Sequence, residues 1–300
     1  MGGFDGVFVL LLLKKVKIPI VSFLHTIPLR KDARNRLHRL KILRSIVNYS
    51  TYTVSISSLG KKALVKNGSV PSKIVTIHHG ALDIPYIKTS EKNKYKKSLK
   101  LENKFVISTY GLLAKSKGIQ YGIEAINKVV KKNPNVVYLV SGQPHPVYIK
   151  RKGEENFYKA LQDMVNKYKI EKNVKFINHF LSQEEIENLL LASDVFLLPY
   201  LSKDQISSGI LANAIAGGCC VISTPFPYAT EIIGKEGQRG FYIDFANPDS
   251  IAKKISYLIK NKKMIESARK NAYVLGRSFT WQKMAEEVTG VFGKAVNKKS

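Results

Sequence analysis

Short runs of β-branched and aromatic residues alternate with segments of helical period along most of the chain. This alternation is typical of βαβ units, because a strand followed by a helix returns to a parallel neighbour. From residue 105 onward the pattern predicts six strands: Phe105–Thr109, Val136–Ser141, Val174–Ile177, Val195–Pro199, Cys220–Ser223 and Gly240–Ile243. We therefore expect an α/β fold with a Rossmann-like parallel sheet in this part of the chain.

A shorter series of the same kind comes first. Strands are predicted at 18–23, 52–56 and 74–77, and the third ends in His78-His79-Gly80. Residues 88–104 are rich in Lys, Ser, Glu and Asn, which indicates an exposed connection. The sequence thus predicts a partial N-terminal Rossmann-like domain (1–87), a linker (88–104), a second Rossmann-like domain (105–280) and a C-terminal helix (281–300) that packs back towards the N-terminal domain.

Two helix starts are marked by capping residues. Ser182 is followed three residues later by Glu185, which is the pattern of a capping box. Asn247 precedes Pro248, which places an N-cap residue before a proline at the first helical position. We expect helices to begin at both places.

Composition favours a folded enzyme in a reducing compartment. A chain of 300 residues with 44% hydrophobic content can bury one or two sizeable cores. The two cysteines, Cys219 and Cys220, lie in an apolar run and are predicted to be small buried hydrophobes. The apolar run 7–13 is too short to span a bilayer before two lysines interrupt it, so we expect a core helix there. We expect a cytoplasmic protein.

The formal net charge of +27 favours a polyanionic partner without identifying it. Nucleic acid, an anionic membrane face and a nucleotide diphosphate all remain open. The densest basic cluster comprises Arg30, Lys31, Arg34, Arg36, Arg39, Lys41 and Arg44. With interleaved leucines and isoleucine it predicts either a basic amphipathic helix on the cytoplasmic membrane face or an ordinary exposed helix.

Glycine-rich and polar segments follow four of the predicted strands. In open parallel sheets ligands bind at the carboxyl ends of the strands, so these segments are candidates for one site. Loops that open helices also offer backbone N–H groups to phosphate oxygens. The segments are Gly111–Gly118, Gly142–Pro146, Gln205–Gly209 and Thr224–Glu231.

The stretch 111–281 resembles glycosyltransferase family 4, whose members are retaining enzymes of the two-Rossmann, GT-B type. The motifs that carry the resemblance are Gly111-Leu112-Leu113, Lys117-Gly118-Ile119, Asp194-Val195-Phe196-Leu197-Leu198-Pro199-Tyr200, Ser223-Thr224-Pro225, Glu231 and Phe279-Thr280-Trp281. His25-Thr26 and Ile77-His78-His79-Gly80 resemble signatures of the family's N-terminal half. A His-Pro dipeptide after the second strand and the Gln205–Gly209 segment resemble a mannosyltransferase-like subgroup.

The resemblance implies roles for individual residues. Lys117 would neutralise the donor diphosphate as the glycosidic bond breaks, and His25 would lie near the transferring sugar. Glu231 would accept hydrogen bonds from the nucleotide ribose. Gly2 and Gly3 would belong to a loop that approaches sugar or phosphate. Further donor contacts are assigned to Gly111, Lys115, His145, Tyr200, Ser207, Ser208, Gly209, Asn213 and Thr224.

Two departures from the family pattern concern charge. The family commonly has two glutamates eight positions apart, where this chain has Gln205 and Asn213. A neutral amide can bond a sugar hydroxyl but cannot act as a base or stabilise positive charge, so Gln205 is a catalytic candidate only as an amide. Leu112 replaces the usual arginine, and Lys115 is expected to compensate. Relative to the family, about 80 residues are missing before Met1; a misplaced start, a natural fragment and a half supplied by another chain all explain this.

We therefore expect a metal-independent hexosyltransferase without a cofactor. The donor would be a GDP- or UDP-hexose, with mannose or glucose as the hexose, and the acceptor a glycan or lipid-linked sugar. One alternative is a catalytically impaired nucleotide-sugar-binding fragment. A nucleotide-sugar epimerase and a basic nucleic-acid-binding protein are weaker alternatives. The latter is weaker because the sequence lacks the aromatic and basic strand pattern of single-strand binders and any zinc or helix-turn-helix signature.

Overall fold

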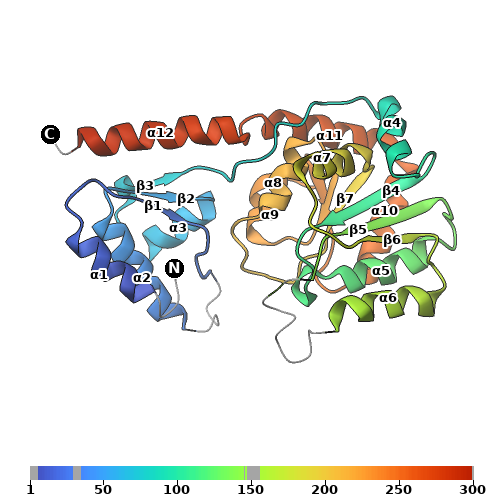
Figure 1. Ribbon diagram of the computed structural model, residues 1–300, viewed down its shortest axis with the longest axis horizontal. Helices are drawn as coiled ribbons and strands as arrows, with labels where there is room; N and C mark the ends of the chain where they lie inside the picture. Colours follow the sequence, from blue (N-terminus) through green and yellow to red (C-terminus); the bar gives the residue numbers. More distant parts are fainter. Residues whose placement is uncertain (1–5, 30–34, 145, 147–155, 299–300) are drawn as a thin grey trace.

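The computed structural model describes residues 6–29, 35–144, 146 and 156–298. These residues form two parallel sheets, one towards each end of an elongated molecule (Figure 1). Helices cover the sheets, so the predicted α/β architecture is confirmed.

The N-terminal sheet has three parallel strands in the order β1-β2-β3. They are β1 (Val21–Leu24), β2 (Tyr52–Ser55) and β3 (Ile74–Thr76). Helices α1 (Gly6–Lys15), α2 (Arg36–Tyr49) and α3 (Ser58–Lys66) accompany them. β2 and β3 are each one residue shorter than predicted, and β1 is two residues shorter and begins three residues later.

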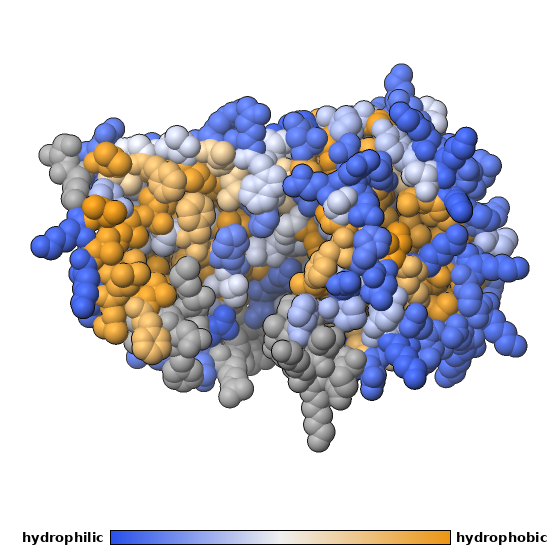
Figure 2. Space-filling model, in the orientation of Figure 1, coloured by the Kyte–Doolittle hydropathy of each residue, from blue (hydrophilic) through white to orange (hydrophobic). Residues whose placement is uncertain are grey.

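Helix α1 lies at the surface, so the prediction of a core helix is wrong. Leu10 and Leu13 pack on the core beside β1, but Phe8 and Leu12 are 71% and 63% exposed. Figure 2 shows apolar side chains gathered at this end of the molecule. An apolar run alone does not predict how many faces of the helix will pack against other elements. In the described ranges no helix is long and apolar enough to cross a membrane.

The basic cluster corresponds in part to helix α2. The helix buries Leu40, Ile42 and Leu43 and leaves Leu37 exposed. It begins after Asn35, which has a left-handed backbone with φ 54°. Three residues of the predicted cluster, Arg30, Lys31 and Arg34, lie outside the described residues.

The larger sheet has six parallel strands in the order β6-β5-β4-β7-β8-β9. Their bounds are β4 Phe105–Tyr110, β5 Val136–Ser141, β6 Val174–Ile177, β7 Val195–Leu198, β8 Val221–Ser223 and β9 Gly240–Tyr242. The order reverses between β4 and β7, as in other doubly wound folds. All six predicted strands are confirmed to within one residue at each end.

Helices cover the faces of this sheet (Figure 1). They are α5 Ile119–Val129, α6 Phe157–Tyr168, α7 Gln183–Ala192, α8 Gly209–Ala216, α9 Pro227–Ile233, α10 Pro248–Lys260 and α11 Lys262–Gly276. Both predicted caps are confirmed. The Glu185 N–H donates to Ser182 Oγ (3.2 Å), and the Ser250 N–H donates to Asn247 Oδ1 (3.0 Å). The two cysteines are buried free thiols, and burial raises the pKa of both.

Residues 88–104 are mostly exposed, as their composition predicts, but they are a folded segment and include buried lysines. They form the 3₁₀ turn Thr89–Glu91 and helix α4 (Lys92–Ser98), which packs against α7. Lys92 and Lys96 are buried. Their ammonium groups are satisfied by backbone carbonyls and by Asp194, and this allows lysine-rich sequence to pack.

Helix α12 (Trp281–Asn297) returns to the N-terminal sheet (Figure 1). Its residues Val288 and Val291 pack with Val54 and Ile77. The chain therefore passes between the sheets twice, at 77–88 and at 276–281. The two passages are bonded: the Ala81 N–H donates to the Phe279 carbonyl (2.7 Å), and the Trp281 N–H donates to the Ala81 carbonyl (3.0 Å).

Candidate functional site at the carboxyl edge of the larger sheet

Four loops at the carboxyl ends of β4, β5, β7 and β8 form the candidate site. The site faces the N-terminal domain. Ser207 Oγ donates to the His25 carbonyl (3.0 Å), and the His79 ring lies against Gly209. The structure therefore brings strand-end segments of both sheets together.

Two glycines allow the loops after β4 and β5 to touch through backbone alone. Gly111 and Gly142 have φ values of +127° and +122°. A Cβ on Gly142 would lie 2.0 Å from the Gly111 carbonyl oxygen. The Leu113 N–H also donates to the Gln143 carbonyl (2.8 Å). The two glycines therefore let the loops after β4 and β5 pack backbone to backbone at this edge.

Lys117 is held over an aromatic ring. It ends the 3₁₀ turn Lys115–Lys117, and its Nζ lies 4.0 Å from the centre of the Tyr200 ring. Tyr200 is buried and stacks on Phe226 with ring centres 5.4 Å apart. Burial raises the pKa of Tyr200, so it remains a neutral phenol. An ammonium group packed on an aromatic face at this edge is a candidate contact for a diphosphate.

Gly118 fixes the position of this turn. It has φ +69°, and a Cβ there would lie 1.9 Å from the Pro199 carbonyl oxygen. The Leu201 N–H donates to the Ser116 carbonyl (2.9 Å). The backbone after β4 is thus pressed against the backbone after β7. Lys115, at the start of the turn, is exposed.

The first turn of α8 presents backbone N–H groups to the site. Ser208 is its N-cap and accepts from the Leu211 N–H (3.2 Å). Gln205 Nε2 donates to the Ser207 carbonyl (2.9 Å), which folds the amide over the same loop. A helix N-terminus carries partial positive charge, so an anion is favoured here.

Two histidines of the N-terminal domain face this helix start. His25 and His79 have ring centres 6.0 Å apart. Burial, and then the charge of His79, lower the pKa of His25, so its imidazole is neutral near pH 7. His79 Nδ1 is 2.7 Å from the Gly80 carbonyl and therefore donates to it, because a carbonyl only accepts. Sequence reasoning did not assign His79 a role, although its position after the third strand was the available signal.

Glu231 bridges the two domains. Its carboxylate accepts from the backbone N–H groups of Ser58 (2.8 Å) and Leu59 (3.2 Å), at the N-terminus of α3. His78 Nε2 lies 3.9 Å from the same carboxylate. The predicted ribose contact would require Glu231 to share or exchange one of these bonds.

Two predicted donor residues have their side chains bonded within the protein. Asn213 Oδ1 accepts from the Leu82 N–H (2.9 Å), and its Nδ2 donates to the Tyr110 hydroxyl (2.9 Å). Thr224 is fully buried, and its hydroxyl donates to the Tyr200 carbonyl (2.7 Å). Both therefore position other groups, so direct donor contact through these side chains is not what the structure shows. Gly2, Gly3 and His145 lie outside the described residues.

A cavity of about 320 Å³ adjoins the α8 side of the site. It is lined by His25, Arg39, Asp204, Gln205 and Ser207, among others. Residues of both domains line it, so it is a candidate position for a second ligand beside the donor site. Among the described residues, no cluster of three His, Cys, Asp or Glu side chains has metal-site geometry.

The fold has clear counterparts among solved structures. Alr3699/HepE of Anabaena, in complex with UDP and glucose, is 18% identical with a TM-score of 0.75 over 92% of this chain and 71% of that one. Sucrose-phosphate synthase of Thermosynechococcus elongatus is 15% identical with a TM-score of 0.77 over 97% of this chain and 71% of that one. The chain thus has the GT-B type of fold.

Family membership follows from the sequence comparison. Residues 90–274 match the family described as glycosyl transferases group 1, and the chain belongs to this family. It is 26% identical over 205 residues to spore coat protein SA of Bacillus subtilis strain 168. That match covers 68% of this chain and 52% of the relative, so the matched region is about half the length of that protein.

Proposed function

We propose that this chain binds a nucleotide diphosphate hexose and transfers the hexosyl unit with retention of configuration. One observation carries the proposal: the Lys117 ammonium, held on the Tyr200 ring, and the first turn of α8 lie at the same carboxyl edge. Two positive groups at one sheet edge match the charge of a diphosphate. Because Alr3699/HepE is described with UDP and glucose, UDP-glucose is the first donor to test and GDP-mannose the second.

The chemistry asked of the site is stabilisation of a leaving group. As the bond from sugar to phosphate breaks, negative charge builds on the diphosphate, where Lys117 and the α8 N–H groups would meet it. No step is assigned to a metal. A neutral His25 can bond a sugar hydroxyl without adding a second positive charge. The acceptor, a glycan or lipid-linked sugar, would enter from the adjoining 320 Å³ cavity, on the face from which the nucleotide departs.

Calorimetric titration of the chain with UDP and with GDP tests the donor site. We expect one nucleotide to bind, and the affinity to fall about tenfold or more in Lys117→Ala. Lys172→Ala is a matched control, because Lys172 is exposed just before β6, at the opposite edge of the sheet. Binding of neither nucleotide, or equal binding by Lys117→Ala, would contradict the proposal. NMR of the sugar released from a cognate donor then gives the stereochemistry.

A catalytically impaired donor-binding protein is the second candidate. It is favoured because Gln205 and Asn213 stand where the resemblance places glutamates, and both amides are bonded within the protein. Nucleotide binding without release of the sugar from any donor would support it. Detectable transfer or donor hydrolysis that is lost in Lys117→Ala would contradict it.

We further propose peripheral membrane contact by a cytoplasmic protein, which suits a lipid-linked acceptor. The supporting feature is α1, whose exposed Phe8, Leu11 and Leu12 are followed by Lys14 and Lys15. Apolar residues next to lysines favour an anionic membrane surface. Flotation with anionic vesicles tests this, and recovery of the protein only in the soluble fraction would contradict it.

A further inference from the structure

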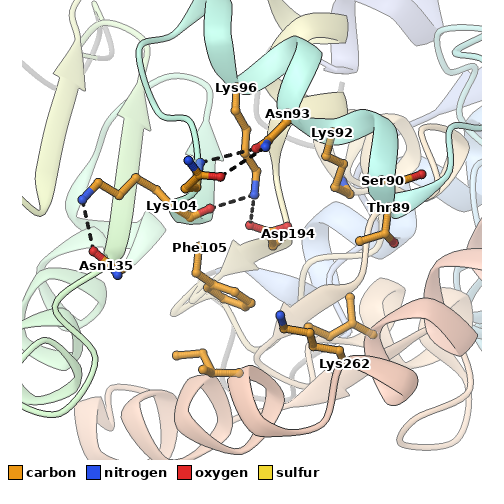
Figure 3. A pocket seen from close by; sticks show the side chains of 13 residues that line it. Thr89, Ser90, Lys92, Asn93, Lys96, Lys104, Phe105, Asn135, Asp194 and Lys262 are labelled. Carbon is orange, nitrogen blue, oxygen red and sulfur yellow. Dashed lines mark hydrogen bonds and ion pairs between the residues drawn. The ribbon is translucent and has the colours of Figure 1, made fainter.

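A second cavity lies at the opposite, amino-terminal edge of the larger sheet (Figure 3). Its volume is about 460 Å³, which is within the range of small-molecule sites. It is bordered by α4, by the residues that precede β4, β5 and β7, and by the junction of α10 with α11. It shares no residue with the candidate donor site.

The cavity has an excess of positive charge. Four lysines line it, Lys92, Lys96, Lys104 and Lys262, against the single carboxylate of Asp194. That carboxylate is already occupied: one of its oxygens accepts from Lys96 Nζ and from the Val106 N–H, each at 2.7 Å. Lys96 and Asp194 therefore neutralise each other.

Two of the other lysines, Lys92 and Lys104, donate only to neutral oxygens. Lys92 is 3% exposed, and its Nζ donates to the carbonyls of Leu191 (3.1 Å) and Ser193. Lys104 Nζ donates to Asn135 Oδ1 (3.3 Å). In the described part of the chain no carboxylate forms an ion pair with Lys92, Lys104 or Lys262.

At Lys92 the pKa shows that this arrangement disfavours the charged ammonium group. Burial, with a smaller contribution from the nearby charges of Arg269 and Lys96, lowers the pKa of Lys92 to about 8, while Asp194 and Cys219 oppose the shift. A buried cation without a counter-ion is unfavourable, and an anion in the cavity would relieve it.

The rest of the lining suits a sugar. Phe105, Ile259 and Ile265 form an apolar side, and Phe105 offers an aromatic ring (Figure 3). Asn93 and Asn135 reach the cavity from the other side. Amide groups both donate to and accept from hydroxyls, and sugar rings have an apolar face that packs on aromatic rings.

We propose that this cavity binds a phosphorylated monosaccharide. Its phosphate lies beside Lys104 and Lys262 within the field of Lys92, and its ring packs on Phe105. A cavity of about 460 Å³ has the size of a small-molecule site, which favours a small anionic ligand.

Calorimetric titration with glucose 6-phosphate, with UDP present to occupy the donor site, tests the proposal. We expect one site per chain and about tenfold weaker binding in the double variant Lys104→Met, Lys262→Met. The matched control is Lys263→Met, Lys270→Met, which removes two exposed charges from the same helix α11 and leaves the cavity intact. Circular dichroism checks that both double variants are folded.

Three outcomes would overturn the proposal. They are the absence of saturable binding, equal affinities in the two double variants, and a loss of binding in Lys117→Ala without a loss in the cavity variant. The last result would place the ligand in the donor site. Inorganic phosphate and glucose are titrated separately. Phosphate that binds as tightly as glucose 6-phosphate would overturn the sugar part of the proposal.

Discussion

Replacing Gly118 by alanine tests whether the turn that carries Lys117 is clamped as tightly as the structure shows. The added Cβ would lie 1.9 Å from the Pro199 carbonyl oxygen, where an ordinary contact needs more than 3 Å. The obstacle is backbone, so it cannot move aside as a side chain would. The φ of +69° is a second obstacle, because alanine adopts this region unwillingly.

The free-energy cost of both obstacles can be estimated. The left-handed backbone costs alanine about 1 kcal/mol, and forcing an atom into a packed site costs about 1–3 kcal/mol. Alanine also lowers the entropy of the unfolded chain, which returns about 0.4–1 kcal/mol. We therefore expect Gly118→Ala to lower the free energy of unfolding by about 1–3 kcal/mol. The turn must shift, so nucleotide affinity should fall as well.

Urea unfolding followed by circular dichroism measures the first effect, and calorimetric titration the second. Gly290→Ala is the control, because nothing lies within 4 Å of a Cβ at this position of α12. Alanine is a better helix former there, so this variant should gain up to about 1 kcal/mol. The proposed clamping of the Lys117 turn would be refuted by one result. In that result, Gly118→Ala unfolds at the same urea concentration as the parent protein and binds nucleotide with the same affinity.

Two further predictions concern the contact between the domains. Glu231→Gln removes the negative charge at the start of α3 and should lower the free energy of unfolding by about 1–2 kcal/mol. The control is Glu286→Gln, at an exposed position, which should change it by less than about 0.5 kcal/mol. Equal effects of the two variants in urea unfolding would contradict the role of Glu231 as a bridge between the domains. Burial lowers the pKa of His25 and of His78, with His79 adding to the shift at His25 and Glu231 opposing it at His78. The unfolded chain therefore binds these protons first, near pH 6.5, and the free energy of unfolding should fall as the pH drops below that value. His78→Gln should reduce the difference in stability between pH 7.5 and pH 5.5, and an unchanged difference would count against this explanation.

The strands and caps of the larger sheet could be predicted because their signals are local. A run such as Val136–Ser141 is β-branched and apolar, and a buried parallel strand needs that composition on both faces. Ser182 and Glu185 bond each other within one turn, so their spacing is sufficient evidence. The convergence of the loops at one edge follows from strand direction alone.

The failures concern contacts between residues far apart in the chain. Glu231 is paired with the start of α3, more than 170 residues earlier, and nothing near either residue indicates this. Lys92 appears solvent-exposed in a lysine-rich segment, but it is buried on the last carbonyls of α7. Asn213 has the spacing of a ligand contact, but its amide is bonded to Leu82 and Tyr110. Such pairings depend on how the sheets and helices pack, which a local pattern does not contain.

The two bonded chain passages between the sheets have a mechanical consequence. One flexible connection would let the domains tilt, twist and slide, but two connections tied by the Ala81 hydrogen bonds form one paired hinge that restricts such motions more than a single strand would. Rotation about it opens or closes the edge that carries Lys117 and leaves the hinge bonds intact. The contacts broken first on opening would be those of Glu231 and Ser207, which lie across the gap from their partners. The modest strength of these hydrogen bonds would set how readily a ligand reaches this edge.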